Sequence, residues 1–305
     1  MKVLLTGAAG QLGQALRTSV PSTINVIATS RNGGDGLEAL DLADAAACQA
    51  VVAQHRPDWV LNAGAYTAVD KAESEPELAH AVNAGAPGAF ARALADQGGR
   101  LLQISTDFVF NGSQGSPYRP NQERDPLGIY GASKAAGEEA IEAVFQGDPR
   151  ALILRTSWVM GPVGKNFALT MLRLHRERDS LGVVADQVGC PSSTLNLARA
   201  CWQSIQRGSQ GTLPPVMHWC DSGAASWYDV SVAVGELGAE LGLLDTPASV
   251  QPIQTSDYPT PAARPSYSLL DCNDTRKALE LSGEHWRTAL KTVLQSTAQA
   301  SGSAS

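Results

Sequence analysis

The stretch that decides the fold is MKVLLTGAAGQLG, Met1 to Gly13. A short apolar run, expected to form a strand over residues 1–6, leads into a Gly-x-x-Gly-x-x-Gly turn that opens a helix ending before Pro21. In dinucleotide-binding folds the first glycine permits the tight turn, the second lets the backbone approach a pyrophosphate, and the third lets helix and strand pack closely. The helix amino terminus adds free N–H groups and a positive dipole. The pattern indicates a dinucleotide site, with a ligand-free glycine turn as the alternative.

Strands and helices alternate along the first half of the chain. Expected strands follow at residues 25–30, 59–63, 100–106 and 151–157, and expected helices at 44–56, from about 75, at 87–97 and from Tyr130 onward. This alternation is typical of an α/β fold with a doubly wound, mostly parallel sheet of the Rossmann type. Ligands of such sheets bind beyond the carboxyl ends of the strands. We therefore expect the strand-end residues to meet at one edge: Gly7, Ala63, Thr106 and Ser157.

Beyond Ser157 the alternation loosens, which predicts a second, smaller lobe. The expected elements are helices at 166–178, 194–207, 226–241 and 286–294, and strands at 181–184 and 216–219. We expect a dinucleotide-binding domain at 1–157, to which the chain returns at about 194–220. The smaller substrate-binding lobe then comprises 158–193 and 221–296, and the low-complexity tail 297–305 is expected to be disordered.

Composition limits the classes of function. The 305 residues, 43% of them hydrophobic, suffice for a substantial core in one large domain or in a domain with a smaller companion. A net charge of −7 without a Lys/Arg-rich run argues against nucleic-acid binding. No apolar run approaches the roughly 18 residues of a membrane span, and the amino terminus is typical of a strand rather than a signal peptide. The five scattered cysteines lack Cys-x-x-Cys spacing, which predicts reduced thiols in a cytoplasmic protein.

The candidate chemistry lies between Ser105 and Lys134. Tyr130 and Lys134 are four apart on an expected helix, so both side chains project from one face. A cation at about 4 Å, in an effective dielectric near 20, favours a phenolate by about 4 kcal/mol. We therefore expect Lys134 to lower the pKa of Tyr130 toward neutrality, where general acid–base catalysis works best. A hydroxyl from Thr106 would hold a substrate carbonyl. Taken alone, the Tyr–Lys spacing also fits two surface neighbours.

Longer motifs run through nearly the whole chain, from Met1 to about Leu294. They are Gly10-Gln11-Leu12-Gly13, Asn62-Ala63-Gly64-Ala65, Ala65-Tyr66-Thr67-Ala68-Val69-Asp70-Lys71-Ala72-Glu73, Ser105-Thr106-Asp107-Phe108-Val109-Phe110, Tyr130-x-x-x-Lys134, Arg155-Thr156-Ser157-Trp158-Val159, Asp186-Gln187-x-Gly189-x-Pro191 and Arg264-Pro265-x-x-Ser268. Together these motifs resemble the extended short-chain dehydrogenase/reductase family, and within it the reductases of nucleotide-linked keto sugars.

The resemblance implies NAD(P)H-dependent reduction of the C4 keto group of dTDP-4-dehydro-β-L-rhamnose to dTDP-L-rhamnose, the last step of dTDP-rhamnose biosynthesis. It implies that Tyr130 protonates the forming alkoxide, that Lys134 holds the nicotinamide ribose, and that Thr106 hydrogen-bonds the carbonyl oxygen. The implied substrate-binding residues are Thr67, Val69, Asp107, Trp158, Gln187 and Arg264. Arg264 would pair with the substrate pyrophosphate, because a guanidinium donates two parallel hydrogen bonds to phosphate oxygens. Arg264 also fits a surface charge, and Trp158 fits a core position equally well.

The cofactor set follows from the same motifs and from the end of the second strand. The implied cofactor-binding residues are Gly7, Gly10, Gln11, Leu12, Gly13, Arg31, Asp41, Leu42, Ala63, Gly64, Ala65, Tyr130 and Lys134. An acid at the end of the second strand would bind the ribose 2′-hydroxyl of NADH and repel a 2′-phosphate. That strand instead ends Thr29-Ser30-Arg31. We therefore expect NADPH to be preferred and NADH to be a poorer donor, unless Arg31 merely solvates a loop.

One departure from the family pattern concerns magnesium. Some reductases of this family dimerise around a magnesium ion held by carboxylates, one of them two residues after the third glycine and another four residues beyond the proline of the Asp-Gln turn. The matching positions here are Ala15 and Leu195, whose side chains have no oxygen, whereas magnesium requires oxygen ligands. We expect no structural metal, and a monomer or a dimer assembled by other contacts.

Three other functions compete with reduction. Nucleotide-sugar dehydratases of this fold place Asp-Glu after the strand-end threonine, whereas Thr106 is followed by Asp107 and Phe108, so the base of an elimination is missing. A 4-epimerase shares the Tyr–Lys pair and stays open as an alternative. A non-catalytic regulatory subunit with a reductase-like fold is the alternative from another class, and the intact Thr106, Tyr130 and Lys134 argue against it.

Overall fold

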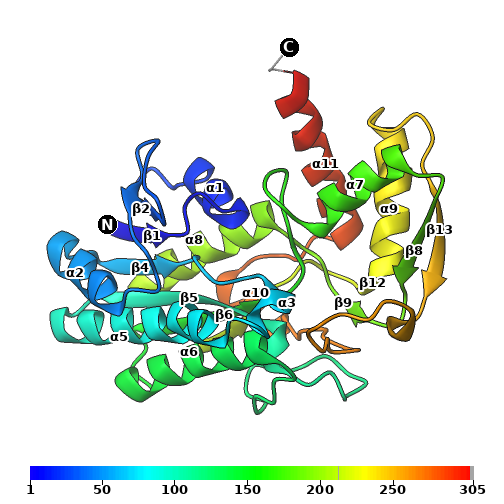
Figure 1. The fold of residues 1–305 in the computed structure, drawn as a ribbon. Coiled ribbons are helices and arrows are strands. Elements are labelled where there is room, and N and C mark those ends of the chain that lie inside the picture. The colour runs from blue at the N-terminus through cyan, green and yellow to red at the C-terminus, as the bar shows by residue number, and fades with distance from the viewer. Residues whose placement is uncertain (212, 303–305) are drawn as a thin grey trace.

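A seven-stranded parallel sheet forms the centre of the protein (Figure 1). The structure is a computed structural model and describes residues 1–211 and 213–302. The strands are β1 (Lys2–Thr6), β2 (Asn25–Ser30), β3 (Glu38–Ala39), β4 (Trp59–Asn62), β5 (Arg100–Thr106), β6 (Ala151–Thr156) and β11 (Val216–His218). Their order is β11-β6-β5-β4-β1-β2-β3. From β1 the chain adds β2 and β3 on one side and then β4, β5, β6 and β11 on the other, so the strand order reverses between β1 and β4. The Rossmann-type doubly wound sheet predicted from the sequence is confirmed.

Helices cover both faces of the sheet, because successive side chains of a strand point to opposite sides. Val3 and Leu5 of β1 pack in one core with α1 (Gln11–Thr18) and α8 (Thr194–Gln210). Leu4, between them, packs in the other core with α2 (Ala45–His55), α5 (Ala86–Gln97) and α6 (Ile129–Phe145). β6 is buried along its whole length, as expected for a parallel strand covered on both faces. The chain thus returns to the sheet through α8 and β11.

A smaller lobe lies beside the carboxyl edge of the sheet (Figure 1). Its helices are α7 (Phe167–Glu177), α9 (Trp227–Glu240) and α11 (Trp286–Gly302), which share a hydrophobic core with the parallel pair β8 (Ser180–Val184) and β13 (Ser249–Ile253). Two short pairings tie the lobe together: β7 (Val159–Met160) with β10 (Ser192–Ser193), and β9 (Val188–Gly189) with β12 (Ala225–Ser226). Ser226 begins α9 with a capping box to Asp229, as its spacing predicts.

The structure adds elements that local sequence patterns did not predict. They are α3 (Val69–Ala72), the π-helical turn Ala81–Gly85, the 3₁₀ turns Asp107–Val109 and Thr255–Asp257, α10 (Asn273–Leu279) and the edge strand β13 inside the Pro-rich region. The helix expected from about residue 75 is α4 (Pro76–His80), which precedes the π-helical turn. At the carboxyl terminus α11 continues to Gly302, where disorder was expected from residue 297, and 303–305 lie outside the described residues. Alanine and glutamine are good helix formers, which accounts for the extension. Within the described ranges, no helix has the length and apolarity to cross a membrane.

Candidate active site

The first turn leaves space only for glycine. Gly7 has a φ of +65°, and a Cβ there would lie 2.6 Å from the Cα of Gly64. A Cβ at Gly13 would lie 2.2 Å from the carbonyl oxygen of Gly7. No side chain caps the amino terminus of α1, so its first N–H groups face the cavity that Gly10 and its neighbours line. The turn therefore provides a close backbone approach and free donors for an anion.

A ladder of buried polar side chains links the strand ends beneath this turn. The Thr6 hydroxyl donates to Asn62 Oδ1 at 2.5 Å, and Asn62 Nδ2 donates to Gln103 Oε1 at 2.7 Å. Thr6 Oγ1 also accepts the Gly64 N–H at 3.1 Å, which fixes the loop after β4. Buried polar groups with complete hydrogen bonding specify one arrangement of neighbouring strands. These hydrogen bonds therefore hold β1, β4 and β5 in fixed positions relative to one another at the sheet edge where a ligand would bind.

One cavity of about 860 Å³ collects nearly all the candidate residues at this edge. It is lined by the predicted catalytic residues Thr106, Tyr130 and Lys134, by all the predicted cofactor-binding residues, and by Thr67, Val69, Asp107, Trp158 and Arg264. Gln187 does not line it. Both ends of the Gln187 amide are bonded within the lobe, to Trp227 Nε1 and Thr255 Oγ1. The structure therefore brings together the predicted site with the exception of Gln187.

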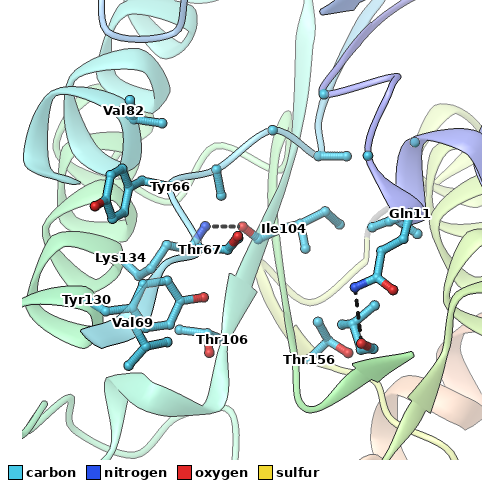
Figure 2. Close-up of a pocket in the computed structure, with 18 of the residues that line it drawn as sticks. Gln11, Tyr66, Thr67, Val69, Val82, Ile104, Thr106, Tyr130, Lys134 and Thr156 are labelled. Carbon is cyan, nitrogen blue, oxygen red and sulfur yellow. Dashed lines mark hydrogen bonds between the residues drawn. The ribbon is translucent and has the colours of Figure 1, made fainter. Parts of the chain in front are cut away.

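Tyr130 and Lys134 come from α6 and face Thr106 at the end of β5 (Figure 2). The Thr106 hydroxyl donates to Asp107 Oδ1 at 3.0 Å and lies near enough to the Tyr130 phenol to lower the phenol's pKa. The ring of Phe108 packs edge-on against Tyr130, with centroids 5.5 Å apart. Two hydroxyl groups thus converge where a carbonyl oxygen could accept hydrogen bonds.

The expectation that Lys134 lowers the pKa of Tyr130 is wrong for this structure. Burial raises the pKa of Tyr130 to about 12, although the nearby Thr106 hydroxyl opposes the rise. The Lys134 ammonium donates instead to the carbonyl oxygen of Ile104 at 2.7 Å, and burial lowers the pKa of Lys134 to about 8. Tyr130 is therefore a protonated phenol at neutral pH, which suits a proton donor.

Asp107 joins two motifs that are far apart in the sequence. Its side chain is buried, and burial raises its pKa to about 6 against the opposing influence of the nearby Ser268 and Thr106 hydroxyls, of which Thr106 donates to Oδ1. Ser268 closes the Arg264-Pro265-x-x-Ser268 motif. At the other end of this motif, Arg264 Nη2 donates to Asp70 Oδ2 at 2.8 Å. Arg264 lines the cavity, whereas Ser268 lies near Asp107 without lining it.

Several contacts fix the position of α6, and hence of Tyr130 and Lys134. Glu73 Oε1 accepts the N–H of Ile129 at 2.9 Å, which caps the helix from outside. One turn after Lys134, the buried Glu138 carboxylate accepts from Arg155 Nη2 at 2.6 Å and Nε at 2.9 Å. Arg124 Nη1 and the Ser105 hydroxyl also donate to Glu138, at 3.0 Å and 2.5 Å. This buried ion pair ties α6 to β5 and β6.

The smaller lobe contributes an aromatic wall to the cavity. Trp158 follows β6 with a φ of +47°, an uncommon backbone conformation for a tryptophan. Its indole stacks on Trp227, with ring centroids 3.6 Å apart and an interplanar angle of 8°. Gly189 packs against the Trp158 ring, since a Cβ there would lie 2.6 Å from it. Trp158 is therefore held as a flat surface at the cavity rather than in the lobe's interior.

Sequence reasoning missed several residues that line the cavity, among them Leu78, Val82, Phe108, Lys165, Asn166 and Trp227. Trp227 directly follows the Ser226 cap and Asn166 begins α7, so both stand at helix starts that the sequence did indicate. Nothing local marks them as ligand contacts. Only the packing of the two lobes brings them to the sheet edge.

No group of His, Cys, Asp or Glu side chains within residues 1–211 and 213–302 could hold a metal ion. Ala15 is buried in α1, and Leu195 is 38% exposed near the start of α8. All five cysteines are buried with free thiols. Thr106, Tyr130 and Lys134, together with Asp107, line the cavity and can supply acid–base chemistry.

Known proteins with similar sequence and structure point to one activity. The family model described as RmlD substrate binding domain matches residues 1–299. The dTDP-4-dehydrorhamnose reductase of Salmonella typhimurium is 35% identical over 295 residues, 96% of this chain and 97% of the relative. That of Streptomyces griseus is 39% identical over 289 residues, 94% of this chain and 91% of the relative. A solved structure of the Bacillus anthracis dTDP-4-dehydrorhamnose reductase, in complex with NADP, has a TM-score of 0.85 at 32% identity and covers 96% of this chain and 98% of that chain.

Proposed function

The chain belongs to the RmlD substrate binding domain family, and on that basis we propose that it reduces the C4 keto group of dTDP-4-dehydro-β-L-rhamnose to give dTDP-L-rhamnose. It is an NADPH-dependent oxidoreductase of dTDP-rhamnose biosynthesis. The observation that supports this function best is the single cavity that joins a dinucleotide turn to Thr106, Tyr130 and Lys134. Free backbone donors, a keto-oxygen site and a protonated phenol are the parts that carbonyl reduction needs.

The residues around the first turn fit a dinucleotide. The open N–H groups of α1 suit a pyrophosphate, and the missing side chains of Gly7 and Gly13 let it approach the backbone. Lys134 and Tyr130 would hold the nicotinamide ribose, and Ala63 to Ala65 would support the cofactor along the loop after β4. NADPH supplies the hydride when it is bound.

The protein's own side chains would supply the proton to the C4 oxygen of the sugar and stabilise the negative charge that develops there. We assign to Tyr130 the transfer of its phenolic proton to the C4 oxygen, because this phenol is protonated at neutral pH. The Thr106 hydroxyl would donate to the same oxygen and stabilise the charge that develops on it. Lys134, held by its hydrogen bond to the Ile104 carbonyl oxygen, would hold the nicotinamide ribose rather than act on the phenol.

Two groups on the smaller lobe would bind the nucleotide sugar. The flat Trp158 indole would flank the deoxysugar, and the Arg264 guanidinium would pair with the pyrophosphate after exchanging part of its contact with Asp70. The position of Gln187 supports an indirect part, since it hydrogen-bonds Trp227 and so holds the ring that stacks on Trp158. Thr67, Val69 and Asp107 stay in the proposed substrate set because they line the same cavity.

A 4-epimerase is the alternative that this geometry leaves to experiment. The test is to mix the purified protein with NADPH and freshly prepared dTDP-4-dehydrorhamnose and to follow the absorbance of NADPH. Reduction consumes NADPH in proportion to the sugar converted. An epimerase would interconvert sugars with no net loss of NADPH, and that result would exclude the proposed reaction.

Arg31 should set the preference for NADPH. Its guanidinium lies 3.4 Å from Asp41, both side chains line the cavity, and both are largely exposed, so the pair can open to a 2′-phosphate. Loss of one charge-assisted contact in Arg31→Ala should lower kcat/KM for NADPH by about tenfold and leave the value for NADH nearly unchanged. Steady-state kinetics with both cofactors measures this, with Arg17→Ala, an arginine outside the cavity, as the control. A wild-type preference for NADH would refute the assignment.

The oligomeric state should not depend on a divalent metal. Ala15 and Leu195 offer no oxygen ligands for a bridging magnesium ion. We expect light scattering to give the same mass with and without EDTA, and reductase activity to be equal in both conditions. A dimer that dissociates on chelation would contradict this prediction.

Given the buried free thiols, we also propose a cytoplasmic location.

A further inference from the structure

The side chain of Gln11 leaves the dinucleotide turn and bonds to the other lobe. Gln11 is the first residue of α1, and its backbone belongs to the glycine turn. Its Nε2 donates to the carbonyl oxygen of Val159 at 3.1 Å, and its Oε1 accepts from Asn166 Nδ2 at 3.2 Å. The nitrogen and the oxygen of the Gln11 amide therefore both hydrogen-bond to a segment about 150 residues away in the sequence.

That segment, residues 158–166, forms part of the cavity wall. It begins with Trp158, whose indole stacks on Trp227, and it contains Gly164 and Lys165 among the lining residues. It ends at Asn166, which caps α7 by accepting the N–H of Leu169 at 3.0 Å. The Gln11 amide thus holds both the start and the end of the segment.

Gln14 shows that this arrangement is particular to Gln11. Gln14 lies three residues further along α1, and its Nε2 donates to the Ala9 carbonyl oxygen at 2.9 Å, within the same turn. The same side chain on the same helix can therefore satisfy its amide locally. Gln11 instead reaches the smaller lobe, where a Cβ at Gly164 would lie in ordinary van der Waals contact with Gln11 Cβ, at 3.7 Å.

We infer that Gln11 is a positioning residue that holds the 158–166 segment against the dinucleotide turn and thereby sets the distance between the sugar-binding wall and the cofactor. The inference rests on the proposed function for the identity of the two ligands. The Gln11 side chain then affects binding of the nucleotide sugar, whereas its backbone contributes to binding of the cofactor. Substitutions of the side chain should therefore weaken sugar binding and leave cofactor binding nearly unchanged.

Hydrogen exchange tests the inference without any ligand. In Gln11→Leu, which keeps the helix propensity and much of the side-chain volume but removes both hydrogen bonds, the backbone amides of residues 159–166 should exchange about tenfold faster. Gln14→Leu is the matched control and should leave the exchange of this segment unchanged. Equal exchange in wild type and Gln11→Leu, or the same acceleration in Gln14→Leu, would overturn the inference.

Kinetics tests its consequence for the reaction. Gln11→Leu should raise KM for the keto sugar by about tenfold, while the dissociation constant of NADPH changes by less than about twofold. Equal weakening of NADPH and sugar binding would show that the side chain serves the cofactor, and would overturn the inference. A wild-type protein that fails to reduce the sugar would refute the proposed function, while the exchange experiment would still decide on Gln11.

Discussion

Replacing Tyr130 with phenylalanine should lower the turnover number by about 10²–10⁴-fold, the usual loss when a general acid is removed. Phenylalanine keeps the edge-on contact with Phe108 and removes only the hydroxyl group. Binding of NADPH should be nearly unchanged, because the dinucleotide turn and Lys134 are untouched. Turnover and the NADPH dissociation constant, measured on the same preparation, separate the two quantities.

Tyr118→Phe is the matched control for this substitution. Tyr118 is also buried, and its hydroxyl donates to Asn111 Oδ1 at 3.1 Å, away from the cavity. It should cost about 1 kcal/mol of stability for the lost hydrogen bond and leave turnover close to wild type. A Tyr130→Phe enzyme that keeps more than half of the wild-type turnover would remove Tyr130 from the mechanism.

Replacing Arg155 with methionine should have the largest effect on stability. Arg155 and Glu138 are both buried at the junction of β6 and α6, and their charges face each other at 2.6 Å. Replacing Arg155 leaves the buried Glu138 carboxylate without the positive charge and the hydrogen-bond donors of the guanidinium. Such a loss typically lowers the free energy of unfolding by about 3–5 kcal/mol. Urea denaturation, monitored by far-ultraviolet circular dichroism, gives the free energy of unfolding.

An exposed pair on the smaller lobe provides the control. Arg173 Nη1 lies 2.5 Å from Glu177, four residues along α7, and both side chains are about half exposed. Arg173→Met should cost only about 0.2–1 kcal/mol, because water solvates the remaining charge. Equal losses in the two variants would show that the buried pair does not hold α6 in place.

The same pair predicts the direction of the pH dependence. Burial alone would raise the pKa of Glu138, but the hydrogen bonds and charge of Arg155, with Ser105 and Arg124, hold it below its ordinary value. A depressed folded-state pKa contributes stability above the unfolded pKa of about 4.3, and that stability is lost as the pH falls through the folded value. Acid unfolding should therefore become less steep in Arg155→Met.

The sheet and the first turn could be predicted because their signals are local. Glycine spacing from Gly7 to Gly13 and the apolar run at 100–106 each fix an element from adjacent residues alone. The return of the chain through β11 was also readable, from an apolar run after a helix. By contrast, β13 lies in a Pro-rich edge position and forms by pairing with β8, which no local pattern announces.

The site was predictable in its residue types but not in all of its contacts. Tyr130 and Lys134 share a helix face as their spacing requires, yet the ammonium bonds to Ile104 rather than acting on the phenol. Gln187 belongs to a readable motif, but the direction of its side chain depends on Trp227, forty residues later. Such details depend on burial and on packing between lobes, which a sequence pattern does not encode.

The most direct test of the central claim follows the hydrogen that reaches the sugar. NADPH carrying deuterium at the transferable position of the nicotinamide is mixed with dTDP-4-dehydrorhamnose and the wild-type protein, and the product is examined by NMR. The product should be dTDP-L-rhamnose with deuterium at C4 of the sugar, and labelling should be at least a hundredfold slower with Tyr130→Phe. Unlabelled product, or no product while NADPH is retained, would rule out hydride transfer from NADPH to C4.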